Sequence, residues 1–211
     1  MGPKSLKDII SKSTRMPNPG ASEPWGFTLV ELLVAMAVAS IVLAAVMSLF
    51  TTYNTSYTKQ NVAADVQQVV RAGVDFMAQS IRMAGLDAAG TGNFGISAAT
   101  SSSITFSADF DLSGGVPGPN ETISYFLNAD ELQSSLNAVP LVENLDIANG
   151  PGLTFTYLDE SGSDLGNPVP ASNLDDIRTV VISITVREPA GKNQTVARTY
   201  STEVKCRNLG L

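Results

Sequence analysis

The sequence predicts an α+β protein in which a long N-terminal helix packs on an antiparallel β-sheet. Three observations in the chain of 211 residues predict this fold. Residues 27–50 are almost wholly apolar. Residues 51–85 repeat apolar side chains at steps of three and four from Val62 onward, and residues 86–211 contain short stretches of alternating apolar and polar residues. The first two patterns indicate a helix and the third indicates strands joined by turns. Beyond the apolar stretch, about 160 residues are enough for one domain.

The apolar stretch at residues 27–50 is long enough to span a membrane. A helix of this length measures about 36 Å, and the hydrocarbon core of a bilayer is about 30 Å thick. Its single charged side chain is Glu31. A carboxylate within a membrane segment is costly, so its presence usually has a functional cause. If the chain were cut after Gly26, the new ammonium group of Phe27 could pair with Glu31 of the same chain or of a neighbouring copy.

The residues from Gly26 to Glu31 and the apolar stretch resemble the processing and assembly segment of type IV prepilins and of type II secretion pseudopilins. The resemblance rests on the glycine, the aromatic residue after it, the glutamate at the fifth position beyond the cut and the helix length. It implies a pilin-like fold and removal of residues 1–26 by a prepilin peptidase. It also implies N-methylation of Phe27 and a role for Glu31 in ordering helices within a filament core.

Two alternatives to a prepilin segment are an ordinary secretory signal peptide and an uncleaved anchor. A secretory signal has an apolar region of about 7 to 15 residues with the cleavage site after it, whereas the glycine here precedes a longer stretch. Four basic residues precede the stretch, and the first ones after it are Lys59 and Arg71. This asymmetry predicts a cytoplasmic N-terminus. Met16 could be the true start instead of Met1, although the shorter leader would lack all four basic residues.

The remaining sequence resembles PilW-type minor pilins most closely. It also resembles, slightly less, the minor pseudopilin of type II secretion that is called the J component. The similar segments are QSIRMAGLDAAG, SITFSADFDLSGG, ETISYFL and the closing VKCRNLGL. The resemblance implies a structural subunit, not an enzyme, that passes from the inner membrane to a surface pilus and helps to initiate or cap it. The implied partners are the prepilin peptidase, membrane lipid, the inner-membrane assembly platform and other major and minor pilins. The first alternative to a minor pilin is a pseudopilin in a periplasmic pseudopilus. The second alternative is a tip adhesin or a DNA-binding module.

Composition narrows the possible functions further. The chain has 13 basic and 20 acidic side chains, and the predicted leader holds 4 of the basic and 2 of the acidic ones. The chain without its leader therefore has 9 basic and 18 acidic side chains, a net charge of −9. This charge disfavours binding to nucleic acid. The absence of histidine excludes Ser-His-Asp and Cys-His nucleophiles. The single cysteine, Cys206, excludes an intrachain disulfide and is expected in the core, with a reactive or intermolecular cysteine as the alternative.

The amphipathic part of the helix is predicted to end near Gly85 and to expose a stripe containing Arg71 and Asp75. Its expected buried stripe consists of Val62, Val66, Val69, Val70, Val74, Met77, Ile81 and Ala84. Period-two patterns predict strands with inward Ile104 and Phe106; Ile123, Tyr125 and Leu127; and Leu153, Phe155 and Tyr157. A final hairpin is predicted from Val180, Ile182, Ile184 and Val186, a turn at PAGKN, and a returning strand with Val196, Tyr200 and Val204 on the side of Cys206.

Asp109, Asp111 and Ser113 in DFDLSGG resemble the start of a calcium loop, where alternating oxygen ligands precede a glycine turn. An EF-hand would need a glutamate at loop position 12, where this chain has Asn120, with Glu121 one residue further. A turn between strands explains the same residues, so the sequence favours no cofactor, with calcium as the alternative. A second acidic set is expected to form a solvated surface: Asp159, Glu160, Asp164, Asp175 and Asp176.

Overall fold

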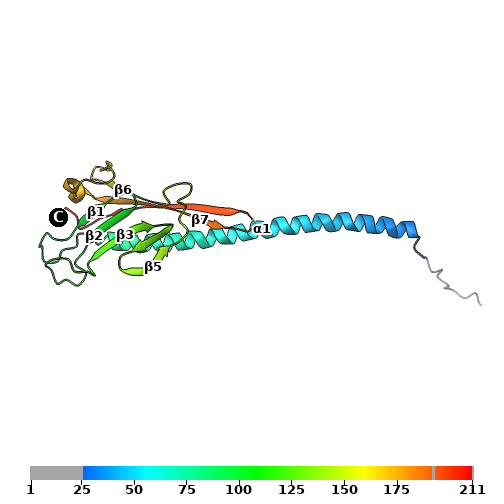
Figure 1. The fold of residues 1–211 in the computed structure, drawn as a ribbon, viewed down its shortest axis with the longest axis horizontal. Helices are drawn as coiled ribbons and strands as arrows, with labels where there is room; N and C mark the ends of the chain where they lie inside the picture. Colours follow the sequence, from blue (N-terminus) through cyan, green and yellow to red (C-terminus); the bar gives the residue numbers. More distant parts are fainter. Residues whose placement is uncertain (1–25, 192, 211) are drawn as a thin grey trace, which may run out of the picture. The chain divides into compact units, whose positions relative to one another are not determined.

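The computed structural model describes residues 26–191 and 193–210, which form two compact units divided after Leu49. The predicted leader up to Trp25, with both candidate start residues, lies outside the described residues. The elements in chain order are α1 (Leu29–Ile81), β1 (Ile96–Ala99), β2 (Ser103–Ser107), β3 (Thr122–Asn128), β4 (Glu131–Ser134), β5 (Asn137–Val142), β6 (Leu153–Leu158), the 3-10 helix η2 (Ala171–Asp176), β7 (Thr179–Pro189) and β8 (Thr195–Lys205) (Figure 1).

Helix α1 continues without a break through the polar segment TTYNTSY, which contains neither glycine nor proline. The hydroxyl group of Thr55 donates a hydrogen bond to the carbonyl oxygen of Thr51 at 2.9 Å. The hydroxyl of Thr58 does the same to Asn54 at 3.0 Å. Because these side chains bond to their own helix, the segment keeps its helical conformation despite poor intrinsic propensity.

The regular part of α1 ends at Ile81, four residues before the predicted terminator. Beyond it, Met83 and Ala84 donate to carbonyls three residues back, so the last turn tightens. Gly85 then adopts a φ of 77°, which favours glycine, and its N–H bonds to the Ser107 carbonyl at the end of β2. The glycine therefore stops the helix as predicted, while the turn before it shortens the α-helical span.

The predicted α+β fold with antiparallel strands is confirmed, and the strands form two sheets instead of one. One sheet has the order β1-β2-β3-β4-β5 and the other the order β6-β7-β8. Strand β6 meets the turn between β1 and β2, where the N–H of Phe155 donates to the Ser101 carbonyl at 2.8 Å and the Tyr157 hydroxyl donates to the Thr100 carbonyl at 2.8 Å. The two sheets are thus joined by hydrogen bonds as well as by a shared core.

A single hydrophobic core contains side chains from both sheets and from the C-terminal part of α1. The period-two residues predicted to point inward are buried, except that Leu127 on β3 and both Val196 and Tyr200 on β8 are half-buried. The helix contributes Val66, Val70, Gly73, Val74, Met77, Ala78 and Ile81. The predicted burial of Val69 is wrong, since its side chain is 52% exposed. With 3.6 residues per turn, Val69 lies roughly 110° from the centre of the buried face.

Cys206 follows β8 and is buried, as predicted, at 6% exposure. Burial raises the pKa of its thiol to about 12. The thiol is therefore protonated at neutral pH and contributes to the core as a small apolar group.

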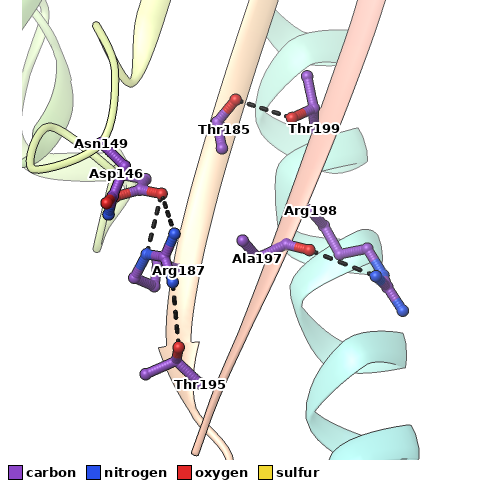
Figure 2. Close-up of polar contacts among 8 residues, drawn as sticks. All are labelled: Asp146, Asn149, Thr185, Arg187, Thr195, Ala197, Arg198 and Thr199. Carbon is purple, nitrogen blue, oxygen red and sulfur yellow. Dashed lines mark hydrogen bonds and ion pairs between the residues drawn. The ribbon is translucent and has the colours of Figure 1, made fainter.

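A carboxylate with little exposure fixes the loop between the two sheets to the final hairpin. Oδ2 of Asp146 accepts hydrogen bonds from Nε and Nη2 of Arg187 at 2.9 and 2.7 Å, and Oδ1 accepts one from Asn149 at 2.8 Å (Figure 2). Nη1 of Arg187 also donates to the Thr195 hydroxyl at 3.0 Å. These contacts hold the segment after β5 against both strands of the β7–β8 hairpin.

We expect Arg187→Gln to lower the free energy of unfolding at pH 7, because it leaves Asp146 without its cationic partner. Hydrogen bonds from Arg187 and Asn149 hold the pKa of Asp146 below its usual range. A depressed carboxylate pKa stabilises the fold above the unfolded value of about 3.9, and this contribution is lost as the pH falls through the folded value. Urea unfolding of the protein in detergent should therefore show a difference from wild type that shrinks below about pH 4.

The matched control is Arg198→Gln on the adjacent strand. Among the described residues the Arg198 guanidinium donates only to the Ala197 carbonyl, at 3.3 Å (Figure 2), so its loss should have little effect at either pH. An equal cost of Arg187→Gln at pH 3 and pH 7 would contradict this role of the ion pair.

Candidate functional site

The first candidate site is the start of α1, where Thr28 acts as the N-cap residue. Its Oγ1 accepts a hydrogen bond from the backbone N–H of Glu31 at 3.2 Å, and its carbonyl accepts the first helical bond, from Leu32, at 3.1 Å. Glu31 is thus the third helical residue, where the sequence pattern T-x-x-E is typical of a capping box. This cap was not predicted from the sequence, although the threonine three residues before the glutamate could have indicated it.

Glu31 is favourably placed for electrostatics at the helix start. A carboxylate in the first turn of a helix is stabilised by the partial positive charge of the unpaired backbone N–H groups. Phe27 directly precedes the cap and is 80% exposed. The structure therefore places the predicted processing residues in an accessible segment ahead of the helix and Glu31 within its first turn.

The apolar part of α1 lacks any cover from the described chain. Every residue from Gly26 to Phe50 is exposed, and α1 is the one helix in the described part that is long and apolar enough to cross a membrane. Apolar surface of this extent is stable only against lipid or against another apolar surface. The segment is therefore consistent with membrane anchoring.

The second candidate site is the loop between β2 and β3. The structure brings Asp109 and Asp111 together with Glu121, which sequence spacing had left outside a calcium loop. Ser113 is not part of this carboxylate group. Its backbone N–H donates to Oδ1 of Asp111 at 2.9 Å, so it supports the aspartate.

The second acidic set forms a solvated surface in the described structure. Asp159 is half-buried, and the other four members are exposed. Oδ1 of Asp159 accepts hydrogen bonds from the Ser161 hydroxyl at 2.7 Å and from the Ser163 backbone at 2.8 Å. The loop therefore satisfies this carboxylate internally.

Residues 26–47 match the family model of the prokaryotic N-terminal methylation motif. None of the curated proteins and none of the solved structures compared with the chain matches it. The motif, ahead of a long helix packed on antiparallel sheets, supports a prepilin-type protein that is type IV pilin-like. The motif implies processing by a prepilin peptidase and assembly with pilins, and proteins of its family are structural instead of catalytic.

Proposed function

We propose that the chain is a minor type IV pilin that is cut between Gly26 and Phe27, methylated at Phe27, and assembled through residues 27–50. The observation that carries this proposal is the methylation motif at residues 26–47, which coincides with the exposed apolar part of α1. The similarity of the later segments to PilW-type minor pilins supports a subunit that initiates or caps the pilus.

In this proposal the apolar helix first anchors the protein in the inner membrane, with the N-terminus in the cytoplasm, and then joins a filament. Lipid and neighbouring pilin helices both offer apolar surfaces. Burial of the apolar helix therefore favours association but does not fix the axial position of one helix relative to the next. A carboxylate at Glu31 that pairs with the ammonium group of Phe27, in its own or a neighbouring chain, adds a directional contact in a medium of low dielectric constant. The inner-membrane assembly platform and other pilins are the partners.

The same motif and helix also support a minor pseudopilin of type II secretion. The two functions differ in the destination of the subunit. Recovery of the subunit in filaments sheared from the cell surface would support the pilus, and its restriction to the periplasm would support the pseudopilus.

We expect co-expression with a prepilin peptidase to yield a protein whose N-terminus is methylated Phe27, as determined by intact mass and N-terminal sequencing. Gly26→Leu should abolish this cleavage, whereas Gly20→Leu in the leader should not. A side chain at Gly26 would meet no atom of the described chain within 4 Å, so a block would reflect poor fit to the peptidase and not misfolding. An N-terminus elsewhere in the presence of the peptidase would contradict the proposal.

A further inference from the structure

Three carboxylates meet where the loop after β2 returns to β3. One oxygen of each of Asp109, Asp111 and Glu121 lies within 4.8 Å of the other two. The antiparallel pairing of β2 with β3 brings Glu121 close to the two aspartates. Ser107 pairs with Thr122, and the N–H of Ala108 then donates to the Glu121 carbonyl at 3.0 Å.

Two of these carboxylates are buried, and each has one satisfied and one unsatisfied oxygen. Asp109 is 0% exposed and Glu121 is 7% exposed. Oδ2 of Asp109 accepts the N–H of Gly114 at 3.2 Å, and Oε2 of Glu121 accepts the N–H of Gly118 at 2.7 Å. Oδ1 of Asp109 and Oε1 of Glu121 are buried without a hydrogen-bond partner in the described structure. A buried carboxylate oxygen in this state needs a partner, which a proton, a water molecule or a cation can supply.

The described residues supply no cationic side chain to this cluster. The two ion pairs among them, Arg71 with Asp75 and Arg187 with Asp146, lie elsewhere. Asp111 adds a third, exposed carboxylate to the cluster, and its Oδ1 accepts the Ser113 N–H at 2.9 Å. The cluster therefore combines one exposed carboxylate with two buried, unsatisfied oxygens.

We propose that Asp109, Asp111 and Glu121 form a calcium-binding site. The available ligands are oxygens alone, which suit calcium or magnesium and not the metals that prefer imidazole or thiolate. Calcium accepts six to eight oxygens in variable geometry, so backbone carbonyls and water can complete a site built on a loop. Magnesium demands a nearly ideal octahedron and keeps much of its water. This site is independent of the proposed filament function.

Calcium at this position would fix the loop that it closes. The loop exposes Leu112 and Val116, which are 67% and 82% exposed, and it contacts the segment after α1 through Gly115. The carbonyl oxygen of Gly115 accepts hydrogen bonds from the Asn93 side chain at 3.0 Å and from the Thr91 hydroxyl at 3.3 Å. Occupancy would thus restrain an apolar surface loop through three carboxylates at its base.

The test compares melting temperatures of the full-length protein in detergent, first stripped with EGTA and then supplied with about 5 mM calcium. For an affinity of about 0.1 to 1 mM, as in extracellular calcium modules, the Tm should rise by roughly 3 to 8 °C and EGTA should reverse the rise. Titration calorimetry with calcium alone should show the same binding. Asp111→Asn and Glu121→Gln should abolish the shift. Asp159→Asn, which alters a carboxylate with similar serine contacts in another loop, should retain it.

A variant that folds but no longer binds separates ligation from structural damage. In EGTA, Glu121→Gln should melt no lower than wild type, because the amide keeps an acceptor for the Gly118 N–H and cannot carry a charge in the buried cluster. Absence of both the shift and the heat of binding would overturn the site, as would a shift that persists in Glu121→Gln. An equal shift with magnesium would overturn the choice of calcium. If lowering the pH from 7 to 5 in EGTA raised the Tm as much as calcium does, the calcium site would be overturned. The carboxylates would then share a proton instead of a metal ion.

Discussion

The Glu31→Gln protein should be cut after Gly26 and inserted into the membrane like wild type, yet be nearly absent from sheared filaments. In the proposed mechanism, the ammonium group of Phe27, in the same or a neighbouring chain, would then be buried without a counter-charge. Removing one member of a buried ion pair costs about 3 to 5 kcal/mol, and about 1.4 kcal/mol is a tenfold change in an equilibrium. Incorporation should therefore fall by roughly a hundredfold to a few thousandfold, measured by immunoblotting filaments against cell membranes.

The cap at the helix start supplies the control for this experiment. Glu31 also occupies the glutamate position of a capping-box sequence, and its N–H is capped by Thr28, so its replacement could act through the helix end instead of through assembly. Glutamine is accepted at the same capping position, and Thr28→Ala removes the cap oxygen while keeping the carboxylate. We expect the Thr28→Ala protein to enter filaments. Normal incorporation of Glu31→Gln beside normal partner pilins would contradict the ion-pair mechanism.

Gly73→Leu should lower the Tm of the protein by roughly 6 to 12 °C. Gly73 is the buried point at which α1 approaches β5, and a Cβ atom there would lie 2.5 Å from Cγ2 of Val142 and 3.4 Å from the Leu141 carbonyl oxygen. Overpacking of a core commonly costs 1 to 3 kcal/mol, and a leucine at this contact should cost about 3. Thermal unfolding in detergent measures the effect, and Ala72→Leu on the exposed side of the same helix should change stability little.

A double-mutant cycle can assign the cost of a side chain at Gly73 to this contact. Gly73→Ala should destabilise the wild-type background, because Val142 leaves no room for the methyl group. In a Val142→Ala background the same change should stabilise the protein by up to about 1 kcal/mol, because alanine is the better helix former. Purely additive effects would contradict the close packing of α1 on β5.

The sequence predicted those elements whose pattern is local and strong. Alternation at Ile104 and Phe106, or at Leu153, Phe155 and Tyr157, reports the two faces of a strand directly, and these side chains are buried. Strands β1, β4 and β5 were missed. Strand β1 carries adjacent alanines, and β5 contains Pro140, which weakens a strand prediction and suits the sheet edge that β5 occupies.

The candidate sites differ in the same respect. The start of the helix could be predicted because Gly26, Phe27 and Glu31 lie within six consecutive residues, and residues 26–47 match the methylation motif. Glu121 could not, because its position beside Asp109 depends on the pairing of β2 with β3 and not on spacing along the chain. Glu121 completes the carboxylate cluster, but it lies outside the spacing of a contiguous calcium loop, so the sequence did not predict it as a ligand.

The burial of Cys206 has a practical consequence for locating the neighbours of this subunit. A protonated thiol inside the core reacts slowly with maleimides and with oxidants, since the thiolate is the reactive form. The folded wild-type chain should thus react only slowly with thiol reagents. A cysteine introduced on the exposed apolar part of α1, for example at Ala39 or Val46, would then be the reactive thiol of the protein. Site-specific cross-linking could map the helices around it without removal of the native cysteine.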